Sequence, residues 1–129
     1  MARWRPPTYD EGTPELERTA EELGIPLEAL RRAMRKGQLV DLKGYTWCTL
    51  DNADEAFSLA EAERIAAGHG RDAWPIAQSI MAGDMMVAPI ILDREPDQRA
   101  YLIAGNTRLM VCRGLDAKPK VWMIHVEGT

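Results

Sequence analysis

The chain has 129 residues, of which 46% are apolar and 28% are charged, and its formal net charge is −4. This length and composition are typical of one globular domain, and the acidic balance excludes a protein that binds nucleic acid through its overall charge. The sequence has no apolar run of about 18 residues, and its two cysteines are too few for a disulfide framework or a structural zinc site, so we expect a cytoplasmic protein with no membrane partner.

The N-terminal part of the chain predicts an exposed arm and two helices. Residues 1–12 contain adjacent prolines and a turn-like sequence, which favour an extended backbone. Thr13 is a suitable N-cap for a first helix, which Gly24 ends. Pro26 suits the start of a second helix that runs to about Gly37.

The middle of the chain predicts a hairpin followed by two helices. The segments 39–42 and 45–50 have the composition of short strands and are joined by a Lys-Gly turn. Ser58 suits the N-cap of a helix that ends near Ala67. After a glycine-containing break, residues 72–82 have the apolar spacing of a further helix.

The C-terminal half has the longest apolar runs and predicts three strands and a helix. The segments 87–92, 100–104 and 120–126 are expected to be strands, the first of them at an edge or an entry point because it contains a proline. A helix is expected over 107–113. Gly114 is expected to end this helix in the left-handed conformation.

The junction between the second of these strands and the helix is a candidate phosphate site. Gly105 and Asn106 precede Thr107 and Arg108, so several backbone N–H groups without helical partners gather at a helix N-terminus. Arg108 in the first turn could add a bidentate guanidinium, and Asn106 or Thr107 could cap the helix or donate to a ligand. The alternative is a plain helix cap beside a surface arginine.

The residues around this junction resemble a known family. They occur in the order Ser79-Ile80, Gly83, Pro89-Ile90, Ala104-Gly105, Arg108, Gly114-Leu115 and Pro119. This order resembles the ParB/sulfiredoxin superfamily over about residues 65–126, and it is most similar to the ParB-like proteins of phages.

The resemblance implies an α+β fold, with a small mixed sheet and flanking helices over residues 38–129, preceded by the arm and helical pair of residues 1–37. It also implies that residues 105–108 bind the phosphates of a nucleoside triphosphate, either ATP or CTP. The superfamily includes CTP-binding DNA-segregation clamps, sulfiredoxins, free-serine kinases and nucleases. The fold alone therefore does not select the reaction.

Two departures from the family's pattern reduce the number of functions that the resemblance implies. Asn106 stands where sulfiredoxins carry their catalytic cysteine, so we do not expect sulfinic-acid reductase activity. Cys112, one turn beyond Arg108, is expected to face the core. The chain ends at Thr129 without the helical DNA-binding domain and dimerisation tail of partition proteins, so we do not expect a full partition clamp.

The glycine-flanked segment around His69 is a second candidate site. His69 could act as a general base or donate to a phosphate, Arg71 could hold a charged group, and Asp72 could bind a metal or take a catalytic role. This segment could face the phosphate-binding helix across a cleft. The alternative is a loop in which Asp72 caps the next helix.

An acidic stretch offers candidate metal ligands. Asp51 and Asp54 lie in an expected loop, where two carboxylates together with nucleotide phosphates would suit Mg²⁺, and Asp51 is also a candidate catalytic residue. The alternative is a solvated acidic surface.

The N-terminal helices carry a different hypothesis, because residues 17–39 resemble a helix-turn-helix of the excisionase type. The second helix carries four basic residues suited to DNA phosphates, Arg31, Arg32, Arg35 and Lys36. The strands after this helix would form a wing. The alternative is a helical cover for the main domain. Trp4, between two arginines of the arm, is expected to dock on a partner or on a second subunit, which would give a homodimer.

We therefore expect a nucleotide-binding protein that acts in DNA or nucleotide metabolism as a phosphotransferase, a nucleotide hydrolase or a nuclease. One alternative is a non-enzymatic regulator that binds DNA through its N-terminal helices. Another is a protein-interaction domain that has kept the fold and lost the site.

Overall fold

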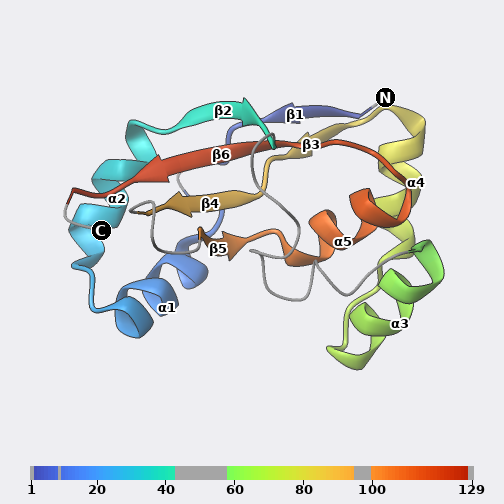
Figure 1. Cartoon of the computed structure of the whole chain (residues 1–129), viewed down its shortest axis with the longest axis horizontal. Coiled ribbons are helices and arrows are strands. Elements are labelled where there is room, and N and C mark those ends of the chain that lie inside the picture. Colours follow the sequence, from blue (N-terminus) through green and yellow to red (C-terminus); the bar gives the residue numbers. More distant parts are fainter. Residues whose placement is uncertain (1, 9, 43–57, 95–99, 128–129) are drawn as a thin grey trace.

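The computed structural model describes residues 2–8, 10–42, 58–94 and 100–127, and shows a mixed α+β protein (Figure 1). The expected α+β class is confirmed. Its main sheet has the strand order β2-β6-β4-β5. The parallel pair β4–β6 lies in the middle, and β2 and β5 pair antiparallel with β6 and β4 respectively. The strands are β2 (Gln38–Asp41), β4 (Ile90–Asp93), β5 (Tyr101–Ala104) and β6 (Lys120–His125).

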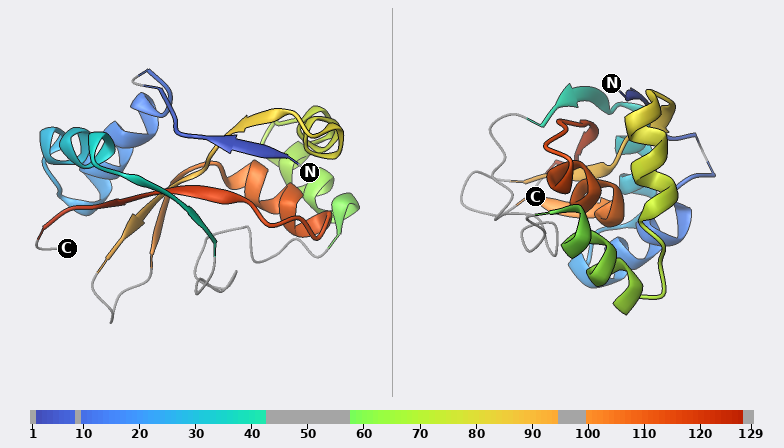
Figure 2. Two further views of the ribbon diagram at one scale, coloured as in Figure 1. Left: turned by 90° about the horizontal axis from the view of Figure 1, so that it is seen from above. Right: turned by 90° about the vertical axis from the view of Figure 1, so that its right-hand side faces the viewer.

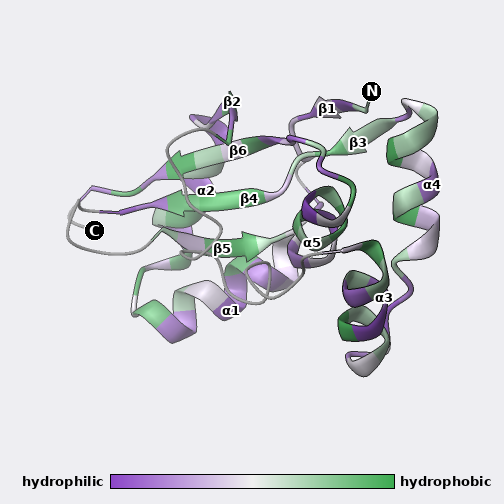
Figure 3. Cartoon of the chain, turned by 45° about the vertical axis from the view of Figure 1, so that its right-hand side comes forward, coloured by the Kyte–Doolittle hydropathy of each residue, from purple (hydrophilic) through white to green (hydrophobic). Residues whose placement is uncertain are grey.

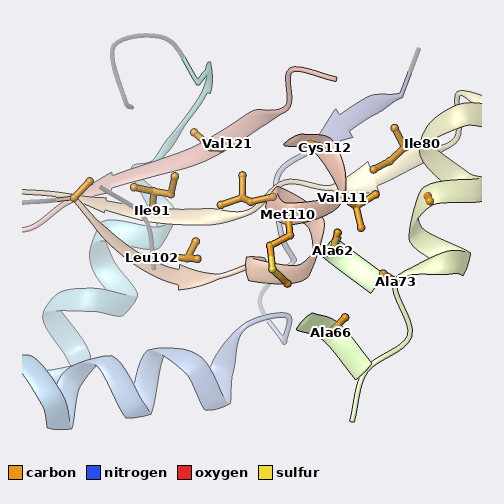
Figure 4. Close-up of a cluster of buried hydrophobic side chains, with 13 residues drawn as sticks. Ala62, Ala66, Ala73, Ile80, Ile91, Leu102, Met110, Val111, Cys112 and Val121 are labelled. Atoms are coloured by element: carbon orange, nitrogen blue, oxygen red, sulfur yellow. The ribbon is translucent and has the colours of Figure 1, made fainter. Parts of the chain in front are cut away.

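Helices cover both faces of this sheet, in two groups at opposite ends of the molecule (Figure 2). On β4, Ile90 and Leu92 contact the first group, whereas Ile91 lies in the cluster of the second group (Figure 4). Burial on both faces explains the continuous apolar run of this strand, since each buried aliphatic side chain contributes about 1.5–3 kcal/mol. The helices are α1 (Thr13–Leu23) and α2 (Leu27–Arg35) in the first group, and α3 (Leu59–Gly68), α4 (Trp74–Ala82) and α5 (Asn106–Gly114) in the second.

The expected exposed arm is in part a strand, and several of its residues are exposed. Residues 3–5 form β1 (Arg3–Arg5), which pairs in parallel with β3 (Met85–Val87). Trp4 is partly buried against the core cluster, and its expected docking on a partner or a second subunit stays a prediction.

The strand expected over 87–92 is two strands, β3 and β4, which belong to different sheets. Ala88 and Pro89 separate them. The N–H of Ala88 donates to Arg5 O at 2.9 Å, and Pro89 has no N–H to give to a ladder. The strand therefore leaves one sheet and enters the other at the proline.

Two predicted helix ends are also wrong. Thr13 is the first residue of α1, and the N-cap is Gly12 in the left-handed conformation with φ 85°. A Cβ at Gly12 would lie 2.8 Å from Ile90 Cδ1, so the glycine lets the chain approach the sheet. At the end of α5, Gly114 is helical, and the left-handed residue is Asp116 with φ 53°.

Other expectations are confirmed. Gly24 ends α1 in the left-handed conformation. Ser58 caps α3 by accepting from the N–H of Glu61 at 3.2 Å. Ala73 is the N-cap of α4, and Asp72 Oδ1 accepts from the N–H of Trp74, the first residue of the helix, at 3.0 Å, which agrees with the alternative interpretation of Asp72.

Strand β2, the first strand of the expected hairpin of 39–42 with 45–50, pairs with β6 in the main sheet, and the hairpin itself stays a prediction. Residues 45–50 lie outside the described part of the chain. Among the helices of the described ranges, none has the length and apolar character to cross a membrane.

Candidate functional site: a cleft at the start of helix α5

The junction of β5 and α5 depends on a glycine. Gly105 has φ 105°, and a Cβ there would lie 2.6 Å from Pro89 Cβ and 2.8 Å from Pro89 Cα. L-residues rarely adopt this backbone conformation, and no side chain fits against the proline. The glycine therefore brings the start of α5 directly against the entry to β4.

The first turn of α5 presents unpaired backbone donors. Leu109 is the first residue whose N–H reaches a helical acceptor, Gly105 O at 3.0 Å. The N–H groups of Asn106, Thr107 and Arg108 precede it and have no intrahelical partner. Together with the positive end of the helix dipole, these donors favour an anion.

Asn106 adds an unpaired acceptor to this turn. Its Oδ1 atom is buried and has no hydrogen-bond partner among the described residues. A buried unpaired polar atom costs about 1–3 kcal/mol, which a ligand N–H or O–H group would recover. The turn thus suits a ligand that carries both an anionic group and a donor.

A pocket of about 450 Å³ opens in front of this turn, and it brings together residues from three parts of the chain. His69 and Arg71 come from the connection between α3 and α4, and Glu15 and Arg18 come from α1. Gly105, Asn106 and Thr107 line the same pocket. The segment around His69 therefore does face the start of α5 across a cleft.

A smaller pocket of about 190 Å³ adjoins the first one, since both are lined by Arg71, Glu15 and Gly105. Arg108 and Asp72 line only the smaller pocket. Arg71 and Glu15 thus line both pockets, while Arg18 lines the larger pocket and Arg108 the smaller one.

Arg108 also stabilises the fold, through a hydrogen bond that the sequence did not predict. Its guanidinium Nη1 donates to the carbonyl oxygen of Val87, and this bond ties α5 to β3. Burial lowers the pKa of Arg108, while the nearby carboxylates of Glu11 and Glu15 raise it. The side chain therefore anchors the helix as well as lining the smaller pocket.

Other candidates are not among the residues that the structure brings to this cleft. Asp51 and Asp54 fall outside the described residues, so the metal site stays a prediction. Within the described ranges, no three His, Cys, Asp or Glu side chains form a group that could hold a metal ion. Cys112 is buried, as expected, and burial raises its pKa to about 12, which removes thiolate character.

The basic residues of α2 lie apart from this cleft. Leu30 and Ala33 are buried against the sheet, so α2 covers the main domain as the alternative interpretation expected. Arg32 and Arg35 are exposed on its outer side, as is Lys36 just beyond the helix. Glu28 pairs with Arg35 at 3.7 Å and reduces the positive charge of this side.

Sequence reasoning missed Glu15 and Arg18. Their spacing of three residues predicts that they share a helix face, but it does not say what this face meets. Only the packing of α1 beside β5 brings them to the start of α5.

No family model, no curated protein and no solved structure matches the chain.

Proposed function

We propose that the cleft binds a nucleotide through its phosphates at the start of α5. The observation that carries this proposal is the convergence of the free N–H groups of the first turn with Arg18, His69 and Arg71 on one pocket. Its volume of about 450 Å³ is in the range of small-molecule sites, about 300–1,000 Å³.

The residues have distinct roles in this proposal. The backbone N–H groups of Asn106 and Thr107 hold a phosphate, and Arg71 neutralises it from the opposite wall. Asn106 Oδ1 accepts from the sugar or the base. Glu15 is placed to accept from a further hydroxyl or amino group of the ligand.

The resemblance to the ParB/sulfiredoxin superfamily supports ATP or CTP as the nucleotide, with Mg²⁺ as its counter-ion. The reaction class would be phosphoryl transfer or nucleotide hydrolysis, with His69 as the general base on the wall that faces the phosphate. Asp51 and Asp54 remain the proposed metal ligands. A phage origin rests on the resemblance alone.

The test is a binding titration by calorimetry with ATP and CTP, with and without Mg²⁺. Arg71→Ala removes one charge-assisted hydrogen bond and should weaken binding about 10- to 100-fold. Arg64→Ala is the matched control, because Arg64 is exposed on α3 and lines neither pocket of the cleft. Arg108 is unsuitable for this test because its loss would also release Val87.

The proposal fails if neither nucleotide binds, or if Arg71→Ala and Arg64→Ala bind equally well. The second candidate function is duplex DNA binding through the exposed basic side of α2. It predicts salt-dependent DNA binding that Arg32→Ala weakens and Arg71→Ala leaves unchanged.

A further inference from the structure

A separate pocket, the α2 pocket, has a volume of about 190 Å³ and lies between the N-terminal arm, α1 and α2. Its floor is apolar, because Leu16 of α1 is buried and Met34 of α2 packs against the same core cluster. Pro7 of the arm extends this apolar surface. A ligand in the α2 pocket would therefore lie at the edge of the cluster that the N-terminal helices share with the sheet.

Helix α1 separates the α2 pocket from the cleft at the start of α5. Thr13 and Leu16 line the α2 pocket, whereas Glu15 and Arg18 line the cleft. Each residue of the second pair follows one of the first pair by two positions, which is about 200° around an α-helix. Figure 3 shows hydrophobic residues between hydrophilic ones along α1, as expected for a helix with two different sides. The α2 pocket shares no lining residue with the cleft, so it is a second site.

The charged residues that line the α2 pocket are both cations. Arg31 and Arg35 lie four residues apart and therefore share one face of α2. Arg31 is partly buried, and it makes no salt bridge to the residues that the structure describes. Arg35 has one contact with a carboxylate, that of the exposed Glu28 at 3.7 Å. A partly buried cation without a counter-charge favours the binding of an anion beside it.

The acidic residue of the neighbouring arm does not supply this counter-charge. Glu11 lies in the chain between the lining residues Thr8 and Thr13, but Arg5 donates to both of its carboxylate oxygens, at 2.8 and 3.0 Å. The hydroxyl group of Thr13 donates to the carbonyl oxygen of Asp10 at 3.3 Å. These groups therefore have partners within the fold, and the guanidinium groups are left as the charged groups that a ligand would meet.

We propose that the α2 pocket binds a small molecule with one carboxylate on an apolar body, of the class of the monocyclic aromatic acids. An apolar cavity of about 150 Å³ can hold benzene, so the α2 pocket has room for one ring. The ring would lie on Leu16 and Met34, and Arg31 would bind the carboxylate. Two arginines and Glu28 leave one net positive charge, which matches a monoanion. A phosphate of DNA would leave the apolar floor uncovered.

Calorimetric titration with benzoate and benzamide tests the proposal, because the two probes share a ring and differ in charge. Benzoate should bind with a dissociation constant of about 0.1–1 mM, as expected for so small a ligand, and benzamide at least about tenfold more weakly. Arg31→Gln should weaken the binding of benzoate about tenfold or more, because it removes a charge-assisted hydrogen bond. Arg32→Gln is the matched control: it removes the same charge from an exposed position of α2 that does not line the pocket.

Heteronuclear NMR of the wild-type protein tests the location. Benzoate should shift the amide resonances of Leu16 and Met34, which belong to the α2 pocket, and leave those of Asn106 and Thr107 in the cleft unchanged. The proposal is overturned by no binding of benzoate up to about 10 mM, by equal binding of benzoate and benzamide, or by shifts confined to the cleft. Equal effects of Arg31→Gln and Arg32→Gln would overturn it as well. Nucleotide binding in the cleft is a separate result, because the two sites share no lining residue.

Discussion

At the scale of single residues, Gly105 decides whether the cleft forms. Its φ of 105° and the 2.6 Å from an added Cβ to Pro89 Cβ both exclude a side chain. Gly105→Ala should therefore lower the free energy of unfolding by about 2–4 kcal/mol. Gly68→Ala is the control, since a Cβ there meets nothing within 4 Å and alanine favours the helix by up to about 1 kcal/mol. Urea denaturation of both variants measures the difference, and equal stabilities would contradict this account of Gly105.

Glu11 makes the stability of the fold depend on pH in the acidic range. Arg5 donates to both carboxylate oxygens of Glu11, at 2.8 and 3.0 Å, and the N–H of Thr8 donates at 2.7 Å. The hydrogen bond from Arg5, with that from Thr8, lowers the pKa of Glu11 from 4.5 to about 2. A lowered pKa in the folded state gives stability that is present above pH 4.5 and is lost as the pH falls toward 2.

The expected effect of Glu11→Gln follows from the lowered pKa of Glu11 in the folded state. The variant should be less stable than the wild type near neutral pH, and the difference should shrink between pH 4.5 and 2. The difference should be modest because the two side chains are about a third exposed, at 37% and 34%. Thermal unfolding across this pH range measures it, and a constant difference at every pH would show that the ion pair does not set the acid dependence.

At the scale of elements, the sequence predicts strands and helices where the signal is local. The apolar segment 100–104 agrees with β5 within one residue. Gly114-Leu115 has the local pattern of a left-handed helix end, yet Gly114 lies inside α5. A Cβ at Gly114 would lie 2.7 Å from Leu59 N, so the glycine permits the approach of α3 to α5. Such a contact joins residues 55 positions apart, and no local pattern reports it.

The candidate site, too, could be predicted only where local sequence patterns indicate it. The first turn of α5 and the segment around His69 were both predicted from residue types that suit phosphate, and the structure brings them to one pocket. The two α1 residues on that pocket and the Arg108–Val87 bond were not predicted, because they depend on which elements become neighbours. The pairing of β1 with β3 was missed for this reason too, since an isolated three-residue strand has little signal.

At the scale of the whole molecule, the N-terminal helices share one core with the sheet. Leu30 of α2 is fully buried, in a cluster that includes Ile90, Ile103 and Ile124 from three strands. Helix α1, the other helix of this pair, contributes Glu15 and Arg18 to the cleft. A ligand in the cleft would therefore stabilise the packing of α1 on the sheet as well as the start of α5.

Leu30→Ala tests this shared core. Removing a fully buried leucine side chain should cost about 2–5 kcal/mol. Because the helices and the sheet share the cluster, the loss should shift a single cooperative transition, seen equally by tryptophan fluorescence and by far-ultraviolet circular dichroism. Leu27→Ala is the control, since Leu27 is only partly buried and should cost less. Two separate transitions, with only the helical signal lost early, would mean that the first 37 residues fold as an independent unit and that the cleft is assembled from two units that unfold separately.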